Sequence, residues 1–181
     1  VGNPLESVDY LERGKIIAYP TESIYGIGCD PFDYDAVQQI YKIKNRPNNK
    51  PMILIASHLT QIEKLVDNNS LTQSVIKSWP GHTTWLLPAS DDCPKWLCDK
   101  KTNKVAIRIS AHTTVESICK NFNKPIISTS ANKSMDRPIK DISKIKDIFK
   151  GEVDFIVEGD LGQESKPSVI KDFETGKIIR D

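Results

Sequence analysis

Short apolar runs recur along the chain and are separated by stretches in which apolar and polar residues follow a helical spacing. The runs are brief and rich in β-branched residues, which is typical of buried strands. They predict strands at residues 15–19, 52–56, 84–87, 105–109, 125–128, 153–157, 168–171 and 177–179.

Helices are predicted between these strands. Residues 35–44 carry their apolar side chains on a single stripe, as an amphipathic helix does. Asp33 or Asp35 is suited to cap the start of this helix, and Pro47 is expected to stop it. Similar stripes predict helices over residues 71–79, 114–122 and 141–149.

The alternation of strands and helices favours an α/β fold built around one mixed sheet with flanking helices. The chain has 181 residues, a length that normally forms one domain. No internal repeat, low-complexity tract or linker divides it. We therefore predict one domain over residues 1–181.

The composition is that of a soluble globular protein, with 38% hydrophobic and 27% charged residues. No apolar run approaches the roughly 18 residues that a membrane span needs, and no signal-peptide pattern is present. We therefore expect a cytoplasmic protein without membrane association. The net charge of +1 differs from that of a dedicated nucleic-acid coat protein, and a basic groove would require that the charges be segregated in space.

The cysteines and histidines do not follow a metal-binding pattern. Cys93 and Cys98 lie five positions apart, no Cys-x-x-Cys pair is present, and the histidines are scattered. We therefore expect no zinc site and reduced thiols. The residues concerned are Cys29, Cys93, Cys98, Cys119, His58, His82 and His112.

Two common phosphate-binding loops are missing. Gly14 and Lys15 do not belong to a G-x-x-x-x-G-K-[ST] loop, because Ile16 follows them and Asp9 occupies the first glycine position. The Gly-Ile-Gly at residues 26–28 starts a dinucleotide fingerprint that Pro31 interrupts. A bound nucleotide must therefore be held in another way.

Residues 19–30 follow a predicted strand and are dense in hydroxyl groups and glycine. Loops at strand ends are where α/β proteins bind ligands. Taken alone, the segment is more simply interpreted as a turn that needs glycine for its backbone.

Several cations gather in residues 42–51, where a predicted helix gives way to a loop. Cations favour a helix C-terminus by roughly 0.3–1 kcal/mol each, which accounts for one or two of them. The remaining pattern of Lys44, Arg46 and Lys50 suits a polyphosphate, because phosphoryl transfer relies on positioned cations.

Polar residues also mark three other places. Ser130 and Asn132 follow an apolar run and can bond a ribose, base or phosphate, or form a turn or helix cap instead. Arg108 interrupts an apolar strand, so it requires either an internal carboxylate or a ligand carboxylate. His82 follows a Pro-Gly turn and is more simply a surface histidine than a catalytic base.

Six segments in this order resemble the YrdC/TsaC family of threonylcarbamoyl-AMP synthases, in their short single-domain bacterial form. They extend over residues 17–172, nearly the whole chain. The segments are YPTESIYGIGCDP, KIKNRPNNKPMILIA, WPGHTTWLLPA, VAIRIS, PIISTSAN and PSVIKD.

The resemblance implies a twisted mixed sheet with a concave ligand-binding face. It also implies a nucleotidyltransferase reaction, in which L-threonine, bicarbonate or CO2, and ATP give threonylcarbamoyl-AMP and pyrophosphate with the help of Mg2+. Downstream threonylcarbamoyl-transfer proteins would then modify an adenosine of tRNA, and tRNA is a further expected contact.

The resemblance also assigns roles to residues. Catalysis falls to Lys44 and Arg46, and no side chain is assigned to a metal. ATP would be bound by Lys44, Arg46, Lys50, Ser130 and Asn132. Threonine would be bound by Thr21, Arg108 and Ser168, with Thr84 a weaker candidate. The chain departs from the family pattern at His82, where proline is common, and near Ser23, where threonine is frequent.

Two other functions remain compatible with parts of the sequence. The first is a non-catalytic RNA-binding module with a basic concave surface, although the balanced charge and the 7% aromatic content disfavour it. The second is a carbamoyl-transferase domain from a larger hydrogenase-maturation enzyme, whose zinc-finger and acylphosphatase neighbours are missing from this sequence.

Overall fold

A computed structural model of the protein describes residues 1–47, 50–133 and 136–181. Most predicted strands are present within one or two residues of their expected ends. The strands are β1 (Ile17–Pro20), β2 (Tyr25–Gly28), β3 (Ile53–Ala56), β4 (Thr83–Pro88), β5 (Lys104–Ile109), β6 (Ile126–Ser130), β7 (Phe155–Ile156), β8 (Val169–Asp172) and β9 (Ile178–Arg180).

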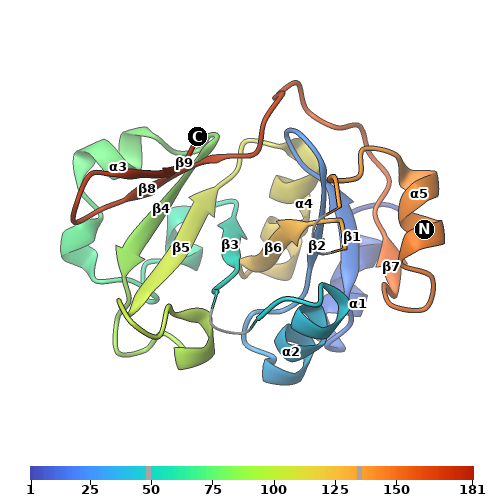
Figure 1. Cartoon of the computed structure of the whole chain (residues 1–181), viewed down its shortest axis with the longest axis horizontal. Helices are drawn as coiled ribbons and strands as arrows, with labels where there is room; N and C mark the ends of the chain where they lie inside the picture. Colours follow the sequence, from blue (N-terminus) through green and yellow to red (C-terminus); the bar gives the residue numbers. More distant parts are fainter. Residues whose placement is uncertain (48–49, 134–135) are drawn as a thin grey trace.

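Within the described residues these strands form one sheet in the order β7-β1-β2-β6-β3-β5-β4-β8-β9 (Figure 1). The sheet is mixed, because β1 pairs antiparallel with β2 and parallel with β7, while β3 pairs parallel with β5 and antiparallel with β6. The predicted α/β fold with a mixed sheet and flanking helices is therefore confirmed.

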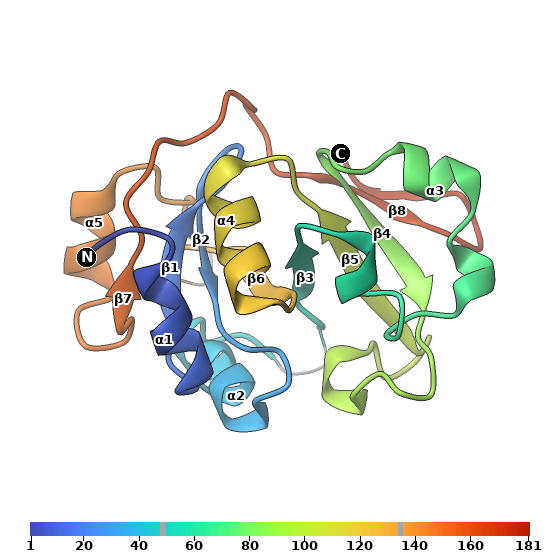
Figure 2. The same cartoon turned by 180° about the vertical axis from the view of Figure 1, so that it is seen from behind.

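Helices and short 3-10 turns surround this sheet. α1 and α4 pack against each other and against β1, and both lie in front of the sheet in Figure 2. No helix in the described part of the chain is long and apolar enough to cross a membrane. The helices are α1 (Glu6–Glu12), α2 (Tyr34–Ile43), α3 (Gln73–Lys77), α4 (Thr113–Phe122) and α5 (Ile142–Ile148), and the 3-10 turns are η1 (Leu59–Gln61), η2 (Asn68–Ser70) and η3 (Lys95–Leu97).

The ends of α2 are set by local chemistry. Asp33 caps the helix, because its Oδ1 accepts a hydrogen bond from the backbone N–H of Ala36 at 3.0 Å. Asn45, two residues beyond the helix, adopts a left-handed backbone with φ of 47°. The helix therefore ends one residue before its predicted end, with Pro47 beyond the left-handed Asn45.

Three local predictions differ from the structure. Residues 25–28, interpreted as part of a glycine-rich turn, form β2. β6 lies so close to Gly28 that an added Cβ would overlap the carbonyl oxygen of Ile127, so this position needs glycine. α1 was not predicted, because only Ser7 and Leu11 are buried on it and no apolar stripe marks it. The helix expected over residues 71–79 is shorter, since α3 covers only its middle.

β5 lies between the hydrophobic core and the site, because its successive side chains point to opposite faces of the strand. Val105, Ile107 and Ile109 point into the larger hydrophobic cluster. Lys104, Ala106 and Arg108 point to the opposite face of the strand, and all three line a cavity. The strand therefore places two cations at the site while its other side chains remain in the core.

Candidate functional site

A cavity of about 600 Å3 lies over one face of the sheet. Its size falls within the roughly 300–1,000 Å3 of small-molecule sites. Residues from β2, β3, β4, β5, β6, β8 and β9 contribute to its walls. Among the predicted site residues, those that line it are Thr21, Arg46, Lys50, Arg108, Ser130 and Ser168.

Lys44 and Asn132 do not line the cavity and lie behind Ser130. The Lys44 ammonium donates to the backbone oxygen of Ser130, and to the backbone oxygen and Oδ1 of Asn132, both at 2.8 Å. Ser130 Oγ donates to the same Oδ1 at 2.6 Å. All three ammonium protons are therefore used inside the protein, and Lys44 holds the end of β6 and the residues after it in place.

Lys44 is 5% exposed, and its surroundings disfavour its charge. Burial, followed by the nearby charges of Arg46 and Lys133, lowers its pKa to about 8. The three oxygen partners carry no formal charge that would reverse this effect. The cluster of Lys44, Ser130 and Asn132 is therefore connected by hydrogen bonds and has no internal counter-ion.

Arg46 lies two residues further along and faces the cavity. Its Nε and one terminal nitrogen donate to the backbone oxygens of Lys50 at 3.2 Å and Pro51 at 3.0 Å. The hydroxyl of Tyr41 donates to the Lys50 oxygen as well, at 3.1 Å. These bonds fix the backbone of residues 50 and 51 next to Arg46, and both Arg46 and Lys50 line the cavity. Asn48 and Asn49 of the same motif lie outside the described residues.

Arg108, on β5, forms a buried ion pair with Glu22. Glu22 also accepts a hydrogen bond from Ser110 Oγ at 2.6 Å. Burial alone would raise the pKa of Glu22, but the charge and hydrogen bond of Arg108, with the bond from Ser110, keep this pKa below its ordinary value. Of the two partners that the sequence left open for Arg108, the internal carboxylate is present. The side chain lines the cavity as well, and its Nε has no hydrogen-bond acceptor among the described residues.

Ser168 stands at the start of β8, where three polar groups meet. Its Oγ lies 2.8 Å from Thr84 Oγ1, and Arg180 donates to its backbone oxygen at 2.8 Å and 3.2 Å. Burial, and then the charges of Arg108 and Arg46, lower the pKa of Arg180. Three guanidinium groups therefore share one cavity and repel one another, which favours the binding of an anion.

The other residues of the predicted threonine region differ in their exposure to the cavity. Thr21 donates its hydroxyl proton to the Ile24 oxygen at 2.8 Å and lines the cavity together with Ser23. Thr84 does not line it and supports Ser168 from behind. His82 does not line it either, and its Nε2 lies 2.7 Å from the Lys166 oxygen. The departures at Ser23 and His82 therefore have different consequences, since only Ser23 faces the cavity.

Several lining cations were missed in the sequence. Lys104 shares the outward face of β5 with Arg108, and the period-two pattern of residues 104–109 could have identified it. Its ammonium is 2.7 Å from Asp172 and 2.6 Å from Glu174, so its charge is already balanced. Arg180 lies on the terminal strand β9, where no sequence signal separates it from an ordinary surface arginine. The missed cations that line the cavity are Lys101, Lys104 and Arg180.

The cavity as a whole is positive and carries hydroxyl groups. Among the described residues, no carboxylate pairs with Arg46, Lys50, Lys101 or Arg180, while Asp99 and Asp172 are the acidic residues of the lining. In the same part of the chain, no group of three or more His, Cys, Asp or Glu is arranged to hold a metal ion. The arrangement suits a ligand that carries more than one negative charge.

Known proteins show the same fold and related sequences. A threonylcarbamoyl-AMP synthase of Coxiella burnetii is 42% identical over 178 residues, which cover 97% of this chain and 95% of the relative. A structure of Pyrococcus abyssi Sua5 in complex with L-threonine is 27% identical with a TM-score of 0.85, over 93% of this chain and 50% of the other. This chain therefore spans about half of the Sua5 chain.

The structure of Escherichia coli YciO is also similar, with 26% identity and a TM-score of 0.86 over 98% of this chain and 88% of YciO. The family model Sua5_yciO_yrdC, described as "Telomere recombination", matches residues 9–181. The chain belongs to the Sua5/YciO/YrdC family.

Proposed function

We propose that the protein is a threonylcarbamoyl-AMP synthase, which joins L-threonine, bicarbonate or CO2, and ATP and releases pyrophosphate. The observation that carries this proposal is one cavity in which Arg46, Arg108 and Arg180 converge with hydroxyl groups. The name of the Coxiella relative and the threonine complex of Sua5 support the same reaction. The reaction class is nucleotidyl transfer, because an adenylyl group moves from pyrophosphate to a carbamate.

The proposed chemistry needs no enzyme nucleophile. The amine of threonine adds to CO2 and loses a proton, which gives a carbamate. A carbamate oxygen then attacks the α-phosphorus of ATP, the bond from this phosphorus to the bridging oxygen breaks, and pyrophosphate leaves. Both reactants are anions, so the protein has to hold them together and offset their repulsion.

The cavity walls offer two groups of residues for this task. Arg46, Lys50 and Ser130 form one group, and we assign the nucleotide to it. Lys44 and Asn132 contribute from behind by fixing Ser130, so we assign them a positioning role in place of direct contact with phosphate.

The second group consists of Thr21, Arg108 and Ser168, and we assign threonine to it. Thr21 is adjacent to Glu22, the ion-pair partner of Arg108, so the hydroxyl and the guanidinium belong to one connected region. Arg180 bonds Ser168 and adds a third guanidinium beside this group. The Arg108 guanidinium and the Ser168 hydroxyl line the cavity and are suited to bind the carboxylate of threonine.

Mg2+ fits this site as part of the nucleotide. Mg2+ bound with nucleotides is usually held by one or two carboxylates, water and the phosphates. Asp99 lines the cavity and can supply such a carboxylate, while Asp172 is already paired with Lys104. When bound, the ion would offset charge on the phosphates.

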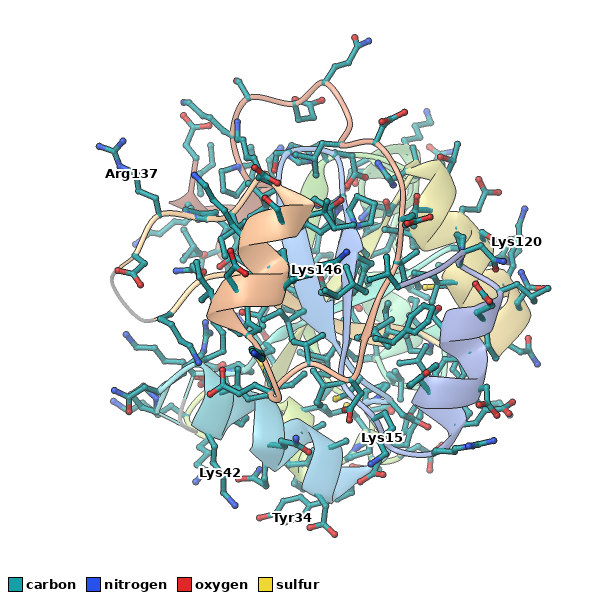
Figure 3. The ribbon with its side chains drawn as sticks, turned by 90° about the vertical axis from the view of Figure 1, so that its right-hand side faces the viewer. Lys15, Tyr34, Lys42, Lys120, Arg137 and Lys146 are labelled. Atoms are coloured by element: carbon teal, nitrogen blue, oxygen red, sulfur yellow. The ribbon has the colours of Figure 1, made fainter. Side chains whose placement is uncertain are left out.

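The RNA-binding alternative is less well supported by the distribution of charge. Figure 3 shows the exposed side chains of Lys15, Lys42, Lys120, Arg137 and Lys146 spread over different elements on one side of the molecule, so they do not form a continuous basic stripe there. The cations of the cavity are instead gathered in a space suited to a small molecule.

The product defines the partners that we propose. Threonylcarbamoyl-AMP is an activated acyl donor, and a transfer protein must move its threonylcarbamoyl group to a tRNA adenosine. We propose that this happens in the cytoplasm, where ATP and tRNA are both present.

The test is a product assay with purified protein, MgATP, L-threonine and bicarbonate. Pyrophosphate release should require threonine and bicarbonate together, and mass spectrometry should detect the mixed anhydride of threonylcarbamate and AMP. Equal pyrophosphate release without threonine would contradict the assigned reaction. A control with Arg46→Ala should release pyrophosphate roughly tenfold to a hundredfold more slowly if the product arises in this cavity.

A further inference from the structure

Two thiols meet outside the main cavity, in the loop between β4 and β5. The sulfur atoms of Cys93 and Cys98 are 3.6 Å apart, and both point toward the backbone oxygen of Pro94. The short turn η3 lies between the two residues in the chain. In a disulfide bond the two sulfurs lie about 2 Å apart. To form one, Cys93 and Cys98 would need to bring their sulfurs closer by less than half of the present 3.6 Å separation.

The two thiols differ in access. Cys98 lines a second cavity of about 410 Å3, whereas Cys93 does not. Tyr34, Trp96 and Lys95 also line this cavity, and Tyr34 and Trp96 meet edge to face with their ring centroids 5.4 Å apart. Both thiols are buried, at 2% exposure for Cys93 and 5% for Cys98, and Cys98 is the one that would lie next to a small molecule in this cavity.

With both thiols protonated, Cys98 donates a hydrogen bond to Cys93 Sγ at 3.6 Å, and once Cys98 loses its proton Cys93 can donate to the thiolate instead. This bond lowers the pKa of the Cys98 thiol, burial opposes the effect, and the Lys95 ammonium adds to it. The same bond, together with burial, raises the pKa of Cys93. Cys98 is therefore suited to act as the nucleophile, and Cys93 keeps its proton beside it.

We propose that Cys98 is an oxidation site for peroxide and that Cys93 resolves the product into a reversible disulfide across η3. Neither thiol has a role in the proposed synthase reaction, so this site adds a redox-dependent modification to the protein.

The proposed steps balance with hydrogen peroxide as the oxidant. The Cys98 thiolate attacks one peroxide oxygen, the O–O bond breaks, and a sulfenic acid and hydroxide form. The Cys93 sulfur then attacks the Cys98 sulfur, the S–O bond breaks, and water leaves with the Cys93 proton. Two thiols are oxidised, and one peroxide is reduced to two waters. A small thiol reverses the change by exchange with the disulfide.

Cys29 and Cys119 provide an internal control. Both are completely buried, and burial raises the pKa of each thiol. Cys119 donates to the backbone oxygen of Ile55, and no other sulfur is within hydrogen-bond distance of either thiol among the described residues. Both should remain reduced while Cys93 and Cys98 react.

The first experiment uses the unmodified protein. It is treated with a small excess of hydrogen peroxide, unfolded in an alkylating reagent, digested and mapped by mass spectrometry. We expect a linked peptide that contains Cys93 and Cys98, alkylated Cys29 and Cys119, and loss of the link after dithiothreitol. Equal oxidation of all four cysteines, or conversion of Cys98 to sulfinic acid without a link, would overturn the proposal.

A second experiment tests the order of the two steps. In Cys93→Ser, a sulfenic-acid probe such as dimedone should label Cys98 after peroxide treatment. In Cys98→Ser, Cys93 should remain unlabelled. Labelling of Cys93 in the second variant at the rate of Cys98 in the first would overturn the assignment of the nucleophile.

A third variant leaves the buried sulfurs untouched. Lys95→Gln removes an exposed cation beside Cys98, and we expect the linked peptide to form roughly twofold to fivefold more slowly when the reaction is run at pH 6, because the Lys95 ammonium favours the Cys98 thiolate. Lys77→Gln, at an exposed lysine of α3, is the matched control and should react at the rate of the parent protein. An unchanged rate in Lys95→Gln would contradict the thiolate assignment.

Discussion

Two buried cations, Lys44 and Arg108, are accommodated in different ways. Lys44 donates to three oxygens that carry no formal charge, and its pKa is lowered to about 8. Arg108 is paired with the carboxylate of Glu22, so this pair of side chains has no net charge. The two side chains are similarly hidden, at 5% and 6% exposure.

The comparison shows that burial of a cation does not define its role. Lys44 has used its donors to fix Ser130 and Asn132, so it acts through them. Arg108 pairs with Glu22 and also lines the cavity, so it can contact a ligand directly. The Arg108 pair should respond most strongly to loss of its partner, because an unpaired buried charge is costly.

The largest effect is expected at the ion pair. Glu22→Gln keeps the size of the side chain but removes the charge opposite Arg108, and it should lower the free energy of unfolding by about 3–5 kcal/mol. Urea denaturation would measure this loss. L-Threonine should raise the melting temperature of this variant more than that of the parent, because its carboxylate can replace the missing charge.

The control is the double variant Glu22→Gln with Arg108→Met, which removes both charges. Its stability should recover most of the loss, since a neutral pair leaves no buried charge. Acid adds a second check. The folded-state pKa of Glu22 is lowered, so its contribution to stability is present above the unfolded-state pKa and is lost as the pH falls through the folded-state pKa. The parent and Glu22→Gln should therefore become more alike in acid, and a constant difference would contradict the pair.

The next effect concerns Arg46 in contrast to Lys44. Arg46→Ala should reduce the affinity for ATP or the rate of synthesis by roughly tenfold to a hundredfold, as the loss of a charge-assisted contact of about 1.5–3 kcal/mol implies. Steady-state kinetics with varied ATP would measure it. Arg46→Lys keeps the positive charge but removes the planar guanidinium with its paired donors. Full activity in this variant would show that only the charge is needed.

Lys44→Met should behave differently from Arg46→Ala. It removes the bonds to Ser130 and Asn132, so a loss of activity should come with a loss of order in residues 130–133, visible by hydrogen exchange. If activity falls while exchange at these residues stays unchanged, Lys44 contacts the nucleotide directly and the positioning role is wrong.

A smaller effect is expected from pH. The folded-state pKa of Lys44, about 8, is below the unfolded value, so the folded state binds fewer protons than the unfolded state between the two values. The free energy of unfolding of the parent, relative to Lys44→Met, should therefore rise by roughly 1–2 kcal/mol from pH 8 to pH 10. A difference that falls over this range would mean that an unrecognised anion balances Lys44.

The smallest effect is expected where two hydroxyls meet. Ser168→Ala and Thr84→Val each remove one partner of the same 2.8 Å bond, and each should lower stability by about 1 kcal/mol. Ser168→Ala also removes the acceptor of a 3.2 Å bond from Arg180, so its loss should be the larger of the two. Only Ser168 lines the cavity, so only Ser168→Ala should increase the KM for threonine through a lost contact. Equal increases of the KM for threonine in both variants would mean that a shift of β8, and not a lost contact, causes the change.

Local patterns were enough to predict much of the fold. The apolar run at residues 105–109 alternates with a period of two, and residues 35–44 carry a helical stripe, so β5 and α2 were found almost at their observed ends. β2 was missed because its Gly28 is required by the close approach of β6, a contact that local patterns do not contain.

The candidate site was predictable in its residue types and less so in their roles. Clustered charged and hydroxyl residues indicated Arg46 and Ser130, and the family resemblance added Ser168; all three line the cavity. Arg180 was missed, because its relevance depends on the position of β9 beside Ser168.

The alternation of strands and helices and the family resemblance could be established from the sequence, because both depend on short-range patterns and on ordered motifs. Which cations face the cavity became known from the three-dimensional arrangement. Lys44 is bound by Asn132 and Arg108 by Glu22, and both partners are distant in the sequence. A side chain's charge is encoded locally, whereas its partner and its burial arise only when remote strands pack together.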